Sequence, residues 1–170
     1  MASARSKDAI ALLKEDHRKV EELFAAFEKA SGDGRKQKLA LEICKELTIH
    51  TILEEEIFYP AVEGKVEDDL LKESFVEHDA AKVMIAEIQA GEPSDEFYDA
   101  KVKVLSEEIE HHVEEEEKRS EGLFAQARKA DVDLDALGGR LEIRKAKLQE
   151  EIEANGLPAP ETITLDEVEV

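Results

Sequence analysis

The chain has 170 residues, of which 42% are hydrophobic, 39% charged and only 5% aromatic, and its formal net charge is −20 at pH 7. This composition favours amphipathic helices over strands of β-branched residues, so we expect an all-α protein with one domain and a tail. The negative charge disfavours binding to nucleic acid and to anionic membrane surfaces, since both require clustered Lys and Arg.

Apolar residues recur at helical spacing in four blocks that turn-forming residues separate. The blocks are residues 10–27, ended by SGDG at 31–34; residues 39–61, ended by Pro60 and Gly64; residues 71–88, ended by GEPS at 91–94; and residues 98–123, which continue to about Ala130. Short connections between long helices favour antiparallel neighbours. The pattern therefore predicts an up-down-up-down antiparallel four-helix bundle over residues 1–130.

Residues 131–170 are expected to form a helical extension and an acidic tail. Apolar positions from Leu134 to Ile152 predict one more amphipathic helix, interrupted near its start by Gly138 and Gly139. These positions either mediate a homodimer or cover one end of the bundle, and we favour covering. The segment from Gly156 to the end has the composition of a loose tail.

The cysteine count and the chain start bear on location and on metal chemistry. Cys44 is the only cysteine, so one chain forms neither an internal disulfide nor a thiolate metal cluster, and any metal needs nitrogen and oxygen ligands. Residues 1–10 lack an uninterrupted apolar segment, and nothing approaches the roughly 20 apolar residues of a membrane span. We therefore expect a cytoplasmic protein.

Each apolar stripe has gaps that histidine or carboxylate fills. The inward positions that are not apolar are His17 in the first block, His50 and Glu54 in the second, Ser74 and His78 in the third, and His112 and Glu116 in the fourth. The fourth stripe selects His112 rather than the adjacent His111. Most of the run at residues 114–117 is expected to be solvated, with only Glu116 facing inward.

The turns provide a second test, because residues at one height of an antiparallel hairpin lie equally far from the turn. Gly32–Gly34 lies midway between His17 and His50, Gly64 midway between His50 and His78, and Ser94 close to the midpoint of His78 and His112. An error of one residue shifts the height by only about 1.5 Å. The four histidines are therefore expected at one level of the bundle.

A metal centre explains this arrangement better than structural burial does. A single buried histidine usually satisfies a hydrogen bond, but four of them with two carboxylates are costly to bury without a cation. His50–Glu54 and His112–Glu116 are both H-x-x-x-E pairs, one helical turn apart, so each carboxylate can reach between two metals. The set of four nitrogens and two carboxylates predicts a two-metal site with open coordination positions.

These segments resemble the hemerythrin-like (HHE cation-binding) family over roughly residues 8–130. The matching segments are DHRKVEELF, IHTILEEEIFYP, VEHDAAKV and HHVEEEE. The resemblance implies a non-haem centre of two iron ions, carboxylate-bridged by Glu54 and Glu116, that binds O2 or a related ligand such as NO or peroxide. Oxygen-carrying members have a further histidine where this chain has Ser74, so water, His111 or a nearby carboxylate is expected to take that position. Sensing, iron handling and peroxide breakdown are then as well supported as simple reversible O2 carriage.

Three functions remain open. The first is a di-iron protein that binds a small ligand for sensing, storage or redox purposes. The second is a di-iron enzyme with peroxidase, catalase-like or ferroxidase activity, although ferritin-type sites use two Glu-x-x-His pairs and the one such pair here, Glu108 with His111, lies off the inward stripe. The third is a structural module that holds zinc or no metal.

Overall fold

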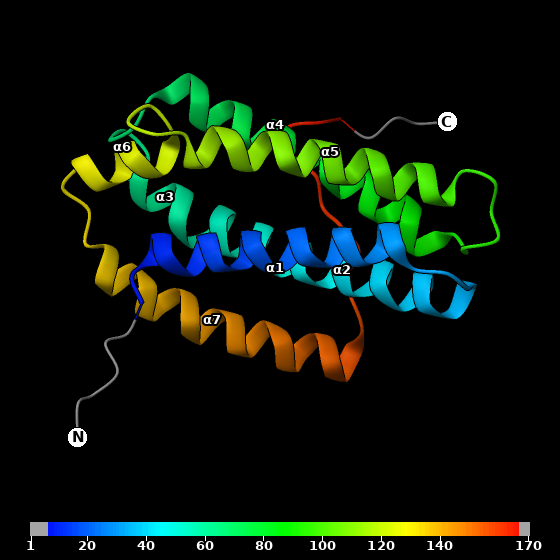
Figure 1. Cartoon of the computed structure of the whole chain (residues 1–170). Helices are drawn as coiled ribbons and strands as arrows, with labels where there is room; N and C mark the ends of the chain where they lie inside the picture. The colour runs from blue at the N-terminus through cyan, green and yellow to red at the C-terminus, as the bar shows by residue number, and fades with distance from the viewer. Residues whose placement is uncertain (1–6, 167–170) are drawn as a thin grey trace.

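The computed structural model describes residues 7–166, and every regular element in this range is a helix, as the sequence predicts (Figure 1). Residues 1–6 and 167–170, which include the end of the predicted tail, lie outside it. None of the described helices is both long and apolar enough to cross a membrane. The elements are α1 (Ala9–Lys29), α2 (Asp33–Leu53), the π-helical turn η1 (Glu54–Phe58), α3 (Tyr59–Val62), α4 (Asp68–Ala90), α5 (Tyr98–Glu117), α6 (Leu123–Lys129) and α7 (Leu134–Asn155).

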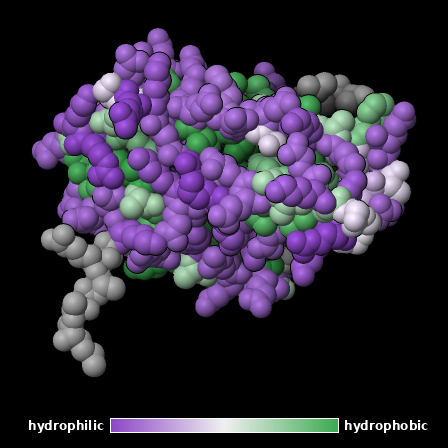
Figure 2. Space-filling view, viewed as in Figure 1, coloured by the Kyte–Doolittle hydropathy of each residue, from purple (hydrophilic) through white to green (hydrophobic). Residues whose placement is uncertain are grey.

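Four long helices form the bundle. α1 packs against α2 and α5, and α4 packs against the same two helices, so the four close into a ring. Consecutive helices run in opposite directions along the molecule (Figure 1). Hydrophilic residues cover most of the face in Figure 2, which fits amphipathic helices with charged outer sides.

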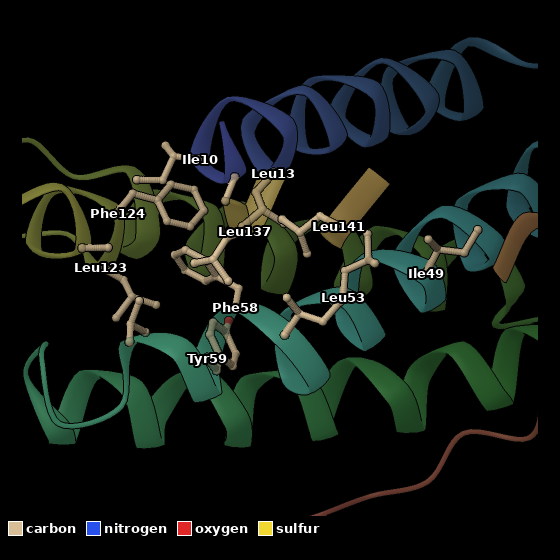
Figure 3. Close-up of a cluster of buried hydrophobic side chains, with 14 of the residues drawn as sticks. Ile10, Leu13, Ile49, Leu53, Phe58, Tyr59, Leu123, Phe124, Leu137 and Leu141 are labelled. Carbon is tan, nitrogen blue, oxygen red and sulfur yellow. The ribbon is translucent and has the colours of Figure 1, made fainter. Parts of the chain in front are cut away.

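The apolar interior is divided into two clusters with a polar layer between them. One cluster includes Leu13, Leu53 and Phe124 (Figure 3), and the other includes Val20 and Ile85. Burying a large apolar side chain contributes about 1.5–3 kcal/mol, so a cluster on either side holds the polar layer firmly. On α1 the layer falls at His17, between Leu13 and Val20.

The prediction that the fourth helix continues to about Ala130 is wrong. α5 ends at Glu117, and residues 118–122 form a tight turn before α6. A Cβ on Gly122 would lie 2.6 Å from the carbonyl oxygen of Lys118 and 2.7 Å from that of Glu116, so this fold-back requires glycine. The turn places Phe124 over the polar layer, where its ring stacks on His17 with centroids 5.7 Å apart.

The C-terminal helix lies along the flank of α1 and α2 rather than across an end of the bundle (Figure 1). Its buried residues Leu137, Leu141, Leu148 and Ile152 join the cluster that includes Leu13. The expected interruption at Gly138 and Gly139 is absent, because the helix passes through both. Gly138 instead permits close packing, since a Cβ there would meet the backbone of residues 7–9.

The tail is more ordered than its composition predicts. Beyond α7 the chain crosses to α4 (Figure 1). Residues 161–165, which we call the C-terminal strap, make hydrogen bonds there with Asp79 and Lys82. A loose tail was expected because the segment is polar and contains Pro158 and Pro160. Its order depends on buried partners on α4, which the composition of the tail does not reveal.

Candidate metal centre

The structure brings all six of the predicted ligand residues together in the polar layer. His17, His50, Glu54, His78, His112 and Glu116 are each at most 6% exposed. The histidines form two pairs. The Nε2 atoms of His17 and His50 are 3.2 Å apart, and so are the Nε2 atoms of His78 and His112.

The two glutamates lie between the histidine pairs. Glu54 Oε1 is 2.8 Å from His50 Nε2 and 3.3 Å from His78 Nε2. Glu116 Oε1 is 3.4 Å from His17 Nε2 and 3.0 Å from His112 Nε2. Each carboxylate therefore faces one histidine of each pair, which is the placement that a bridging ligand requires.

The ligand atoms group into two possible cation positions that share Glu54. Ligand atoms of His17, His50, Glu54 and Glu116 all lie within 4.8 Å of one another, and those of Glu54, His78 and His112 do likewise. Both oxygens of Glu54 and Oε1 of Glu116 are buried without a hydrogen-bond partner. Buried carboxylate oxygens without hydrogen bonds are costly, so the donor set fits cations.

A ring of four further carboxylates surrounds the histidines. Each accepts a hydrogen bond from the Nδ1 of a histidine on the neighbouring helix, because an ionised carboxylate can only accept. The pairs are Asp16 with His50 at 3.0 Å, Glu55 with His78 at 3.3 Å, Glu77 with His112 at 3.2 Å and Glu117 with His17 at 2.8 Å. This carboxylate ring leaves every Nε2 directed at the centre, the arrangement that orients metal-binding imidazoles.

The charged surroundings also shift the histidine pKa values. Burial lowers the pKa of His50, but the charges of Glu54 and Asp16 outweigh it and raise the value to about 10. The pKa of His112 lies well above its ordinary range because Glu116 and Glu54 outweigh burial, and that of His17 is also raised. The centre therefore attracts positive charge strongly, whether protons or metal ions supply it.

Tyr59 reaches the centre, which the sequence stripe did not predict. Its fully buried hydroxyl donates to Glu116 Oε2 at 3.1 Å and lies 3.2 Å from His78 Nε2. The π-helical turn just before it, in which the Tyr59 N–H bonds to the Glu54 carbonyl, adds one residue to the helical turn and rotates Tyr59 inward. Pro60 was the available signal, because a proline ring disrupts regular helical bonding.

Ser74 stands where a further histidine was expected, and His111, one of the candidates to replace that histidine, lies outside the centre. Ser74 is buried, but its hydroxyl donates to the Leu70 carbonyl at 3.0 Å. His111 is exposed and faces Glu115 at 3.3 Å and Glu77 at 3.6 Å, outside the buried layer. The Tyr59 hydroxyl is the additional polar group on the His78 side of the centre.

A small cavity of about 20 Å³ adjoins the four histidines. Its apolar wall is formed by Val20, Leu47, Ala81, Ile109 and Val113. A volume of this size holds about one water-sized molecule. The space beside the imidazoles is therefore suited to a very small ligand.

Sequence reasoning missed the carboxylate ring, because it assigned Glu117 to solvent with most of the run at residues 114–117 and gave the other three residues no role. A signal was present, since Asp16 precedes His17, Glu55 follows Glu54, Glu77 precedes His78 and Glu117 follows Glu116. Each ring residue is thus the chain neighbour of a predicted ligand. It turns toward the histidine of the next helix rather than toward its own neighbour.

Comparisons with known proteins bear on the family and the fold. The model of the hemerythrin HHE cation-binding domain matches residues 8–127. The fold is similar to that in a crystal structure of a hemerythrin HHE cation-binding domain-containing protein from Mycobacterium kansasii, with a TM-score of 0.71. The superposition covers 89% of this chain and 95% of that one, and the two sequences are 21% identical. A DNA nickase of Nostoc sp. (strain PCC 7120 / SAG 25.82 / UTEX 2576) is 29% identical over 106 residues, 62% of this chain but only 30% of that protein.

Proposed function

Because the chain belongs to the hemerythrin HHE cation-binding domain family, we propose that its buried centre holds two iron ions and binds O2 or a related small ligand such as NO or peroxide. The observation that carries the proposal is the set of four inward Nε2 atoms, each backed by a carboxylate, around two glutamates with orphaned oxygens. Two cations between these groups would satisfy all of them together.

The residues divide naturally between two ions. His17 and His50 would hold one, His78 and His112 the other, and Glu54 and Glu116 would bridge them. Imidazole and carboxylate together suit iron, and six side chains leave open positions on two ions that favour octahedral coordination. Ferrous iron in such a site supplies electrons to O2 or peroxide.

The walls of the site restrict which ligand it accepts. The cavity of about 20 Å³ has room for about one molecule of the size of water, which rules out an organic substrate and favours a ligand of very few atoms. Its apolar side chains exclude bulk water from the imidazoles. The side chains around the cavity would therefore select ligands by size and keep the metal site dry.

Tyr59 favours peroxide breakdown as a second candidate function. The pKa of Tyr59 lies well above its ordinary value, because burial and the charges of Glu116 and Glu54 disfavour the phenolate. The hydroxyl, 3.1 Å from Glu116 Oε2 and 3.2 Å from His78 Nε2, therefore stays protonated and would offer a hydrogen-bond donor to peroxide bound in the centre. Steady O2 release from hydrogen peroxide that is lost in Tyr59→Phe would support this function.

Metal analysis with anaerobic and aerobic absorption spectra tests the main proposal. The unmodified chain should bind about two Fe(II) per molecule without air and develop near-ultraviolet charge-transfer bands in air. His112→Ala should reduce the iron content, whereas His111→Ala, which changes the exposed neighbour, should leave it unchanged. Failure to bind iron anaerobically would refute the proposal, and binding of zinc alone would favour a structural module.

A further inference from the structure

The C-terminal extension, residues 134–166, contacts the carboxylate ring directly at one place and reaches it through Lys82 at another. The first is on α7, where Lys145 Nζ donates to Asp16 Oδ1 at 2.6 Å. The other oxygen of Asp16 accepts from His50 Nδ1 at 3.0 Å. Burial would raise the pKa of Asp16, but hydrogen bonds from His50 and Lys145 hold it below its ordinary value. Lys145 thus supports the carboxylate behind His50.

The second place is Asp79, a completely buried carboxylate on α4. It accepts hydrogen bonds from the backbone N–H groups of Ile163 and Leu165, at 3.0 and 3.1 Å, and from both the N–H and the hydroxyl of Thr164. Hydrogen bonds to an ionised carboxylate are among the stronger ones, about 1.5–3 kcal/mol each. Asp79 therefore anchors the C-terminal strap.

Lys82 connects the anchored strap to His78. Its Nζ donates to the Glu161 carbonyl of the strap at 2.8 Å and lies 3.3 Å from Asp79 Oδ1. The same Nζ donates to Glu55 Oε2 at 2.9 Å, and Glu55 Oε1 accepts from His78 Nδ1 at 3.3 Å. Without the strap, Lys82 would lose one acceptor and Asp79 most of its donors.

We propose that the C-terminal extension is a positioning element of the metal centre. Lys145 holds Asp16 behind His50, and the strap holds Lys82 and Glu55 behind His78, so the extension supports one histidine in each pair. This inference rests on the proposed function, in that the pairs bind cations. The extension lies outside residues 8–127, the part that the family model matches.

The test measures Co²⁺ affinity in full-length chains that retain one half of the centre. His112→Ala leaves the His17/His50 half, and His50→Ala leaves the His78/His112 half. In the His112→Ala background, Lys145→Ala should weaken Co²⁺ binding about tenfold and Asp79→Asn should leave it unchanged. In the His50→Ala background, Asp79→Asn should weaken Co²⁺ binding about tenfold and Lys145→Ala should leave it unchanged. Loss of a partner behind a metal-binding histidine typically weakens metal affinity by about 10–100-fold. Lys145 acts one contact beyond such a partner, and Asp79 acts two contacts beyond it, through Lys82.

Controls separate positioning from general stability. Lys147→Ala removes an exposed lysine of α7, the helix that carries Lys145. Among the described residues Lys147 pairs only with Glu151, at 3.9 Å, so this variant should leave the Co²⁺ affinity of both halves unchanged. Lys145→Arg should restore binding in the first half. Thr164→Ala removes one hydroxyl from Asp79 and serves as the milder strap variant if Asp79→Asn fails to fold.

The outcomes distinguish the inference from the proposed function. Equal weakening of both halves, or a lower unfolding midpoint with unchanged Co²⁺ affinities, would show that the extension is only structural. If the unmodified chain bound no Co²⁺ and no Fe(II), both the inference and the proposed function would be wrong. Weaker Co²⁺ binding in only the half of the centre that each variant supports would agree with both the inference and the proposed function.

Discussion

Binding of two cations should release about two protons from the centre at pH 7. Each Nδ1 donates to a ring carboxylate, so any further proton on an imidazole must sit on Nε2. The Nε2 atoms of each pair are 3.2 Å apart, a distance that accommodates one hydrogen between them but not two. In the metal-free centre His50 and His112, whose pKa values are raised by the neighbouring carboxylates, each carry an inner proton, and the cation that enters each pair displaces it.

The magnitude follows from linkage between proton and metal binding. One proton per cation makes the affinity rise about tenfold per pH unit, or 1.36 kcal/mol, below the pKa of the pair. The raised pKa of His50, about 10 against 6.5, means that its proton stabilises the metal-free fold fully below pH 6.5 and progressively less toward pH 10. The difference in free energy of unfolding between the metal-bound and the metal-free protein should therefore increase as the pH rises.

Calorimetric titration with Co²⁺ in buffers of different ionisation enthalpy measures the proton release. His50→Ala should reduce the release to about one proton, because one shared proton disappears with the pair. His111→Ala, which alters the exposed neighbour of His112, should leave it unchanged. No release at pH 7 in the unmodified chain would show that the inner nitrogens carry no proton and would refute the reasoning.

Three further outcomes test particular residues. Tyr59→Phe should destabilise the metal-free protein by about 1.5–3 kcal/mol in urea unfolding, because Glu116 loses a buried hydrogen bond; an unchanged midpoint would contradict that bond. Gly138→Ala should cost about 1–3 kcal/mol, since its Cβ would press on the backbone at Lys7, while Gly139→Ala, with open space around it, serves as the control. Cys44, buried with its pKa raised to about 12, should react with a thiol reagent only after unfolding, and fast labelling of the folded chain would contradict this burial.

The helical period and the turn positions predicted most of the centre. The gaps at His17, His50, Glu54, His78 and His112 are local properties of single helices, and turn symmetry sets their common height. Such information is contained in the spacing of residues along the chain. The inward placement of the six predicted residues could therefore be obtained without coordinates.

Features that depend on departures from the regular period could not be predicted in this way. The π-helical turn changes the helix phase by one residue, so the stripe drawn through Glu54 and Ile57 missed Tyr59. The break after Glu117 likewise depends on the fold-back at Gly122. Regular periodicity assumes one helix geometry throughout, and these two sites violate that assumption.

The sequence by itself determined the helical class, the four-block organisation and which imidazoles and carboxylates face inward, because these follow from periodicity within each helix. Only the tertiary structure decided which carboxylate stands behind which histidine, since those hydrogen bonds join different helices. The same holds for Lys145 and the strap, whose partners Asp16 and Asp79 lie far away along the chain. Contacts between distant segments depend on how helices pack, which residue spacing within one helix does not specify.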